Sequence, residues 1–330
     1  MKSTLAALAI VFSLMSVPGV QAQSKPSVVE ITEWVVPWEK SRPRDPYVDG
    51  QGRVWFVGQT GNYVANLDPK TGRFTRTEIE AGTHPHNLIV DGSGTVWYAG
   101  NANGRIGRIA ADGKITTLLT EGVRDPHTLV FDQKGDIWFT AQQANYVGRV
   151  DTKTGQVHTI PVPTSNSRPY GITVDSKNRP WFVEFNSNKL ASIDPATMTI
   201  TEHTLPNEKA RARRLEATAD GMIWYADYMR GMIARFDPRT GQVKEWPAPG
   251  GPKSLPYAMA QDDRGRLWIT ETGIQPNTLA GFDPKTERWF SVTPIAKSGG
   301  LTVRHMIFHK PTRTLWFGTD ANTIARAVVP

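Results

Sequence analysis

The sequence has 330 residues, no cysteine and a formal charge of +7 at neutral pH. The absence of cysteine excludes disulfide bonds, thiolate catalysis and thiolate metal sites, so burial alone must stabilise the fold. The positive charge is spread along the chain without a recognisable nucleic-acid-binding module, which argues against nucleic acid as a partner and leaves a small anionic ligand open.

The first 22 residues have the pattern of a signal peptide. Lys2 precedes an apolar run from Leu5 to Phe12, and small residues at positions 20 and 22 precede the expected cleavage site. No later segment approaches the roughly 20 consecutive apolar residues that a membrane helix requires. We therefore expect a periplasmic or secreted protein without a membrane span, in which residues 23–330 form a single domain.

One tryptophan recurs in the same strand-like context, at intervals of 42, 41, 43, 43, 44 and 48 residues. A period of this length, with short β-patterned segments and turns between the tryptophans, is typical of a four-stranded propeller blade. Apolar neighbours place each indole in the packing between blades rather than against a ligand. The seven positions are Trp55, Trp97, Trp138, Trp181, Trp224, Trp268 and Trp316.

The third repeat illustrates the unit. Strand-like segments at 127–131, 136–140, 146–150 and 156–160 are separated by turns, of which 151–155 reads DTKTG. Asp starts such a turn, and Gly accepts the positive φ near its end. The sequence therefore predicts an all-β, seven-bladed β-propeller made of four-stranded antiparallel blades.

The two ends of the chain complement each other. The last repeat stops at Pro330 after three strands, whereas the segment 31–37 resembles the outer strand at 200–206. We expect the N-terminal segment to supply the missing strand of the last blade, which removes the open edge of the ring.

In a propeller the first strand of each blade lines the central channel, and its start lies beside the end of the second strand. Eleven residues before each tryptophan, at this start, every repeat has Arg, His or Tyr. We expect these side chains to converge at one mouth of the channel, the basic and tyrosine side chains to bind substrate, and a histidine to act as the base. They are Arg44, His86, His127, Tyr170, Arg213, Tyr257 and His305.

Acidic residues are expected at the same mouth. Glu184, Asp227 and Glu271 lie three residues after their tryptophans, and Asp125 lies two residues before His127. Carboxylates ligate Mg²⁺ and other divalent ions, and histidine titrates near neutral pH. The pattern predicts a divalent metal on these carboxylates, His127 or His305 as catalytic base, and no organic cofactor. The alternative is a mouth whose polar side chains only bind water and one another.

The repeat resembles the virginiamycin B lyase family of streptogramin-inactivating propellers, which connects the sequence with antibiotic resistance. The resemblance covers the whole mature chain. It is carried by Pro126-His127-Thr-Leu leading to Trp138-Phe, by Pro169-Tyr170-Gly-Ile leading to Trp181-Phe-Val-Glu184, and by Asn103-Gly-Arg-Ile-Gly-Arg-Ile109.

The resemblance implies elimination rather than hydrolysis: Mg²⁺ polarises the ester of a cyclic depsipeptide while a histidine removes a proton next to the alcohol carbon. In that family the histidine lies in the last blade, as His305 does here, between two metal-binding glutamates. This sequence has Val303 and Thr319 at the glutamate positions, and Tyr257 where the preceding blade of the family has a second histidine.

Three functions remain open at this point. The first is a metal-assisted carbon–oxygen lyase that opens a lactone or ester. The second is a lactonase or other hydrolase in which Glu184, Asp227 and Glu271 hold a divalent ion that activates water. The third is a non-catalytic propeller that binds an anionic ligand or a protein. We expect a monomer that takes a small molecule.

Overall fold

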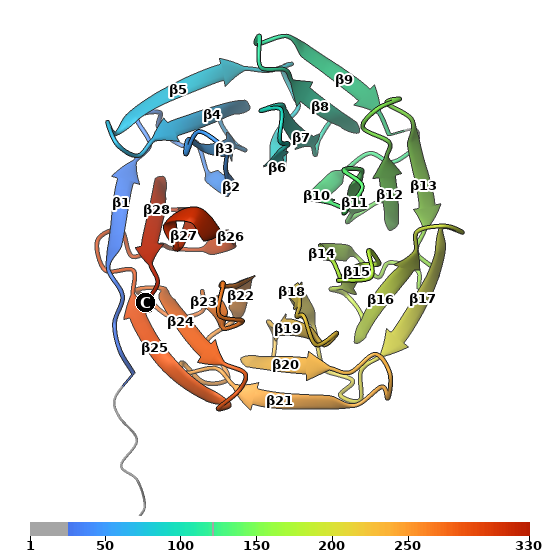
Figure 1. The fold of residues 1–330 in the computed structure, drawn as a ribbon, viewed down its shortest axis with the longest axis vertical. Helices are drawn as coiled ribbons and strands as arrows, with labels where there is room; N and C mark the ends of the chain where they lie inside the picture. The colour runs from blue at the N-terminus through green and yellow to red at the C-terminus, as the bar shows by residue number, and fades with distance from the viewer. Residues whose placement is uncertain (1–25, 121) are drawn as a thin grey trace, which may run out of the picture.

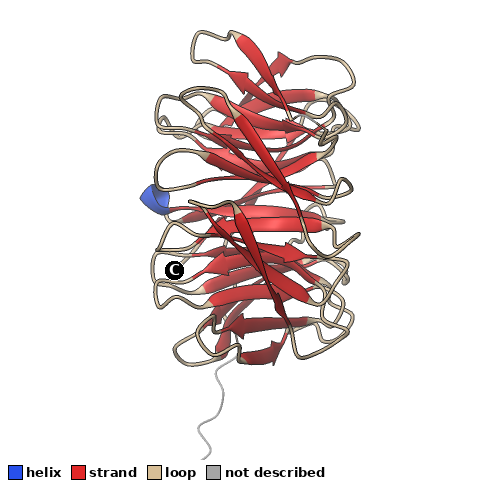
Figure 2. Ribbon diagram, turned by 90° about the vertical axis from the view of Figure 1, so that its right-hand side faces the viewer, coloured by secondary structure: helices blue, strands red, loops and turns tan. Residues whose placement is uncertain are grey.

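The computed structural model describes residues 26–120 and 122–330, and the predicted signal peptide lies outside them. Seven four-stranded antiparallel sheets surround a central channel, and the first strand of each sheet is innermost (Figure 1). From the side the sheets form a thick disc with loops on both faces (Figure 2). The predicted seven-bladed propeller is confirmed. The described residues include no helix long and apolar enough to cross a membrane.

The blades follow the chain in order. Blades one and two contain β2 (Pro43–Val48), β3 (Val54–Gly58), β4 (Tyr63–Asp68), β5 (Arg73–Glu78), β6 (Pro85–Val90), β7 (Val96–Gly100), β8 (Arg105–Ile109) and β9 (Ile115–Leu119). Blades three and four contain β10 (Pro126–Phe131), β11 (Ile137–Ala141), β12 (Tyr146–Val150), β13 (Val157–Pro161), β14 (Pro169–Val174), β15 (Pro180–Glu184), β16 (Lys189–Asp194) and β17 (Thr199–Thr204). Blades five and six contain β18 (Ala212–Ala217), β19 (Ile223–Asp227), β20 (Met232–Phe236), β21 (Val243–Pro247), β22 (Pro256–Gln261), β23 (Leu267–Glu271), β24 (Thr278–Asp283) and β25 (Arg288–Pro294). Blade seven contains β26 (Val303–His309), the short 3₁₀ helix η1 (Lys310–Thr312), β27 (Thr314–Thr319), β28 (Thr323–Val328) and β1 (Ile31–Val35).

The N-terminal strand closes the ring as predicted. Strand β1 pairs antiparallel with β28 as the outermost strand of blade seven. The Trp34 ring stacks on Trp316 with a centroid separation of 5.6 Å. Blade seven is therefore built from both ends of the described chain.

The repeat tryptophans form the packing between blades. All seven are buried. Trp138 of blade three, for example, packs with Ile172 and Phe182 of blade four. The prediction that these indoles are core residues rather than ligand platforms is confirmed.

Each first strand contains a one-residue bulge near its start. In blade three Pro126 pairs with Ala141, but the next paired residue, Leu129, lies opposite Phe139. Two consecutive residues, His127 and Thr128, are thus inserted where the partner strand has one. A bulge of this kind re-aims side chains, so each blade presents two neighbouring residues to the channel.

The last blade differs from the other six by one residue. Val130 pairs with Trp138 across eight positions, whereas Ile307 pairs with Trp316 across nine, because η1 lengthens the turn. Val303 pairs with Thr319 as Pro126 does with Ala141. The structural equivalent of His127 is therefore Arg304, and the position that the sequence count assigned to His305 was wrong by one residue.

Candidate functional site at the channel mouth

The second residue of each first strand belongs to the outer ring, at the face where the first strands begin. The third residue belongs to the inner ring, one position deeper in the channel. The outer ring consists of Arg44, His86, His127, Tyr170, Arg213, Tyr257 and Arg304, and the inner ring of Asp45, Asn87, Thr128, Gly171, Arg214, Ala258 and His305. Six of the seven outer-ring residues are those predicted from the sequence.

Asp45 is a buried carboxylate of the inner ring with two guanidinium groups as neighbours. Its carboxylate accepts hydrogen bonds from Asn87 at 2.9 Å and from the guanidinium groups of Arg44 and Arg214, both at 3.3 Å. Burial alone would raise the pKa of Asp45, but the two guanidinium groups outweigh it and hold the pKa far below its usual range. The carboxylate is therefore ionised at neutral pH.

The histidines of the two rings are held neutral. His86 and His127 are buried, with their ring centroids 3.5 Å apart and their planes tilted by 35°. Burial, reinforced by Arg44 and Arg214, lowers the pKa of both well below the usual value, and it lowers the pKa of His305 to about 3. All three are neutral imidazoles at neutral pH, each with one ring nitrogen protonated.

A tyrosine pair occupies the other side of the outer ring. The Tyr170 and Tyr257 hydroxyl groups form a short hydrogen bond, and both side chains are buried. Burial opposes ionisation of Tyr170, but Arg213, Arg214 and Arg44 favour the phenolate and lower its pKa to about 7. Burial, followed by the neighbouring Tyr170, raises the pKa of Tyr257. Tyr170 is therefore the member of the pair that ionises more readily, and the Tyr257 hydroxyl can donate to it when it does.

Arg213 covers this pair with a guanidinium held in an aromatic cage. Its Cζ lies 4.0 Å from the ring centroid of Tyr257, 4.3 Å from those of Phe185 and Tyr228, and 4.9 Å from that of Tyr170. Its Nε has no hydrogen-bond partner among the described residues. Because the cage supplies no carboxylate, a ligand that brings an anionic or carbonyl oxygen would complete this site.

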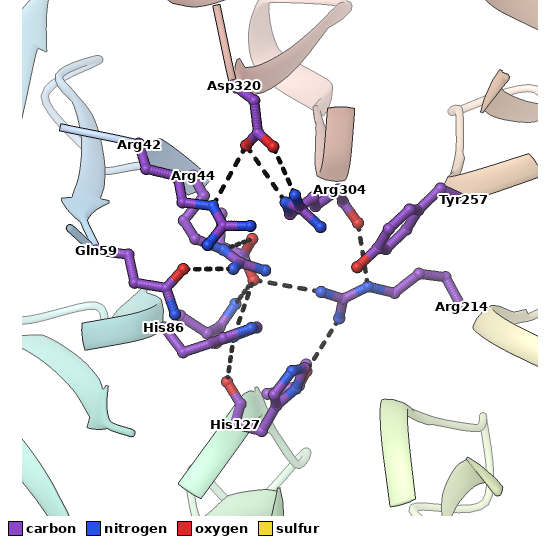
Figure 3. Close-up of polar contacts among 12 residues, drawn as sticks. Arg42, Arg44, Gln59, His86, His127, Arg214, Tyr257, Arg304 and Asp320 are labelled. Carbon is purple, nitrogen blue, oxygen red and sulfur yellow. Dashed lines mark hydrogen bonds and ion pairs between the residues drawn. The ribbon is translucent and has the colours of Figure 1, made fainter. Parts of the chain in front are cut away.

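Two more arginines extend the basic surface across the mouth. Arg304 binds Asp320 at 2.5 Å, and the partly exposed Arg42 lies 3.6 Å from the same carboxylate (Figure 3). One aspartate thus faces two guanidinium groups. Basic side chains therefore extend from the caged Arg213 to Arg42 across the mouth.

The four carboxylates predicted to bind metal lie apart, and each stabilises its own surroundings. Asp125 accepts the backbone N–H groups of Gln143 and Ala144, and Asp227 accepts the N–H of Arg211 and pairs with Arg230. Glu271 accepts the N–H of Gly250 and the hydroxyl of Thr278, while Glu184 accepts the hydroxyl of Ser187. Within residues 26–120 and 122–330 no group of three or more His, Asp or Glu side chains could hold a metal ion. The expected grouping of Asp125 and Glu184 with His127, or of Glu184 with Asp227 and Glu271, is not formed.

Sequence reasoning missed the inner ring and Asp320. Asp45 and Arg214 directly follow outer-ring residues in the sequence. The consecutive charged pairs Arg44-Asp45 and Arg213-Arg214 were therefore the sequence feature that could have indicated an inner ring. A regular strand would turn the second residue of each pair away from the channel. Only the bulge brings both residues into it.

Comparison with known proteins places this geometry in context. The sequence model of the virginiamycin B lyase family matches residues 24–273. Virginiamycin B lyase from Staphylococcus aureus superposes with a TM-score of 0.82 at 23% identity, covering 91% of this chain and 99% of that one. A streptogramin B lyase gives 0.81 at 24% identity, covering 90% and 97%. No curated protein sequence matches the chain.

A more distant structure has the same architecture. Hydrazine synthase from Kuenenia stuttgartiensis superposes with a TM-score of 0.73 at 14% identity, covering 89% of this chain and 97% of that one. At such identities the structural neighbours support the propeller fold and nothing finer.

Proposed function

Because the chain belongs to the virginiamycin B lyase family, we propose that its channel mouth opens the ester of a small molecule by elimination, with Tyr170 as the base and arginines stabilising the leaving carboxylate. The observation that carries the proposal is the Tyr170–Tyr257 pair beneath the caged Arg213 guanidinium. A general base is most effective when its pKa lies near the working pH, as that of Tyr170 does at about 7.

The metal that the family resemblance implies does not fit this mouth. Val303 offers no oxygen on its side chain, and the Thr319 hydroxyl is hydrogen-bonded to Thr323. On the corrected register the residue two before Arg304 is Thr302, which is not a carboxylate either. We therefore assign the stabilisation of negative charge to guanidinium groups and derive no step through a metal.

The proposed elimination balances without water. The Tyr170 phenolate takes a proton from the carbon next to the ester's alcohol carbon, and the released electron pair forms a carbon–carbon double bond. The alcohol C–O bond breaks, and the acid half leaves as a carboxylate. Arg213 and Arg304 both lie near the Tyr257 ring, so their guanidinium groups are on the side of the mouth where they can stabilise the charge on the departing oxygen.

The experiment is turnover of a cyclic depsipeptide followed by chromatography and mass spectrometry. Quinupristin is a suitable trial substrate, because a catalytically inactive variant of the Staphylococcus aureus enzyme has a structure with it. Elimination gives a ring-opened isomer of unchanged mass, whereas hydrolysis adds one water. We expect the isomer from the wild type, also in the presence of a chelator, and none from Tyr170→Phe. A product that contains added water, or full activity of Tyr170→Phe, would contradict the proposal.

Burial of the ring favours a second candidate, a ligand-binding propeller without turnover. Arg44, His86 and Tyr170 are each no more than 4% exposed, so the outer ring closes the channel and leaves Arg213 and Arg304 as the accessible groups. Saturable binding of cyclic depsipeptides or carboxylates that produces no new compound would support this function over the lyase.

Export of the chain remains part of the proposal. It is supported by the signal-peptide pattern of residues 1–22. We expect the protein in the periplasmic or secreted fraction. N-terminal sequencing of that protein should show a mature chain that begins near Gln23.

A further inference from the structure

The half of the channel below the inner ring contains a cavity of about 430 Å³, which we call the lower channel. Residues of the first strands of all seven blades line it. Its walls are mostly apolar and include the side chains of Ile89, Val130 and Ile307. A concave apolar space of this size, with few polar groups, has the character of a small-molecule site.

Glu216 is the one residue with a carboxyl group among the described residues that line the lower channel. The residue keeps part of its surface exposed to the channel, and burial is the cause that acts on the pKa of its carboxyl group. The pKa of Glu216 is raised to about 8 by this burial. An unpartnered carboxyl group inside an apolar cavity lacks the hydrogen bonds that buried polar groups normally have.

Ala260 is a small residue at the same level of the lower channel as Glu216. Each of the two pairs with the repeat tryptophan of its own blade, Ala260 with Trp268 and Glu216 with Trp224. Gly171 of blade four lies nearer the mouth, at the level of Arg214, where a Cβ would lie 2.7 Å from the backbone oxygen of Arg213. At the level of Glu216, β14 has the short side chain of Thr173.

The other polar groups of the lower channel are neutral or already paired. Arg214, at the inner end, binds Asp45 and Thr128. Burial lowers the pKa of both His305 and His309 on β26, and burial raises the pKa of Tyr47 on β2, so these groups are uncharged near pH 7. Strands β14 and β22 contribute the uncharged Thr173 and Gln261. Glu216 is thus the group that can gain most from a charged ligand.

We propose that the lower channel is a second ligand site, which binds a small organic cation with its ammonium group on Glu216 and its apolar body against the channel wall. Tyr47, Phe131 and Phe308 add aromatic surface to this wall, and aromatic faces attract ammonium groups. The site lies at the opposite end of the channel from the caged Arg213 and takes a ligand of opposite charge. It is independent of the proposed lyase activity.

Calorimetric titration with benzylammonium, and with benzyl alcohol as its uncharged counterpart, tests the site. We expect benzylammonium to bind the wild type at least tenfold more tightly than benzyl alcohol does, and Glu216→Gln to remove that difference. Glu208→Gln, an exposed substitution, should leave it unchanged. Equal affinity of benzylammonium for the wild type and Glu216→Gln would overturn the proposal.

Two further measurements keep the test independent of folding defects. Ala260→Leu fills the space beside Glu216 without altering charge, and it should weaken both probes. In the wild type, the affinity for benzylammonium should rise about tenfold per pH unit from pH 6 towards 8 and then level off, because the ligand needs the ionised carboxylate. The probe itself keeps its proton in this range, as a lysine side chain does. An affinity independent of pH, or unaffected by Ala260→Leu, would place the ligand elsewhere.

Discussion

Asp262 and Trp268, six residues apart, are joined by a 3.0 Å hydrogen bond from the indole Nε1 to the carboxylate. The other carboxylate oxygen accepts two backbone N–H groups of the intervening turn. One aspartate thus shapes the turn between the first two strands and satisfies a buried indole. The same bond recurs in blades one to four, between Asp49 and Trp55, Asp91 and Trp97, Asp132 and Trp138, and Asp175 and Trp181.

Replacing one of these aspartates should destabilise the domain more than replacing a turn aspartate that holds no indole. Asp132→Ala removes the bond to Trp138 and two turn bonds, and it leaves a buried N–H unsatisfied. We expect a loss of about 2–3 kcal/mol in the free energy of unfolding. Asp151→Ala, which removes only exposed turn bonds, should cost about 1 kcal/mol or less. Urea denaturation compares the two, and equal costs would refute a role for the indole bond.

Closure by the N-terminal strand should control the stability of the whole ring. Removing residues 30–38 deletes β1, including Glu33, which accepts hydrogen bonds from Ser298 and Thr323. It also opens the edge of β28. We expect a lower melting temperature in a single transition, and a smaller decrease for Trp34→Ala, which keeps the strand but loses the stack on Trp316 and the contact with Arg326. Thermal unfolding by circular dichroism measures both, and an unchanged melting temperature after the deletion would contradict closure as a source of stability.

The architecture could be predicted from the sequence because its signals are local and repeated. The tryptophan period, the Asp-to-Gly turns and the matching chain ends each report a contact between segments close in sequence or equivalent by repetition. The position of His305 could not be predicted in the same way. Counting from Trp316 assumes a constant turn length, and η1 adds one residue that no residue type marks.

The predicted grouping of the carboxylates around a metal ion is absent for a different reason. Position along a strand predicts which end of the blade a side chain occupies, but not which donor it meets there. Glu184, Asp227 and Glu271 are at the expected strand ends, yet each finds a partner in the adjacent turn or strand of its own blade or a nearby loop. A buried carboxylate takes the nearest donors, because leaving it unsatisfied costs free energy.

Ligand binding at the mouth should depend on Arg213. Its guanidinium is packed against four aromatic rings and has an unsatisfied Nε, so an anionic ligand would gain a charge-assisted hydrogen bond there. Arg213→Gln should weaken binding of a carboxylate ligand about tenfold or more, equivalent to about 1.4 kcal/mol. Arg239→Gln, which alters an exposed arginine paired with Asp237, is the matched control. Equal affinities of the two variants would exclude the cage as the anion site.

The pH profile of turnover should identify the base. Tyr170 acts as the phenolate, so kcat/KM should rise about tenfold per pH unit below pH 7 and level off above it. Tyr257→Phe removes a hydrogen bond that stabilises the phenolate, so the midpoint should shift to higher pH. Steady-state kinetics between pH 5.5 and 9 would show both effects. If Tyr257→Phe leaves the midpoint of the kcat/KM profile unchanged, the base is another group.

Acid destabilisation provides a separate test of the buried ring. The unfolded chain protonates His305 near pH 6.5, whereas the folded chain does so only near pH 3, because burial and Arg214 disfavour the cation. Between these values the unfolded state binds the extra proton, so this residue makes stability fall as pH falls below 6.5. The limiting slope is about 1.4 kcal/mol per pH unit.

Glu216 acts in the opposite direction, so the total stability curve is not diagnostic. Its folded pKa of about 8 lies above the unfolded value, so the folded state binds the extra proton and stability falls as pH rises towards 8. The informative quantity is the difference in unfolding free energy between wild type and His305→Asn. The unfolding free energy of His305→Asn, relative to that of the wild type, should rise steadily from pH 6.5 to pH 4.5. That of His158→Gln, an exposed substitution, should not change relative to the wild type. Urea denaturation at half-unit pH intervals measures this difference, and a constant gap would mean that His305 accepts a proton in the folded ring.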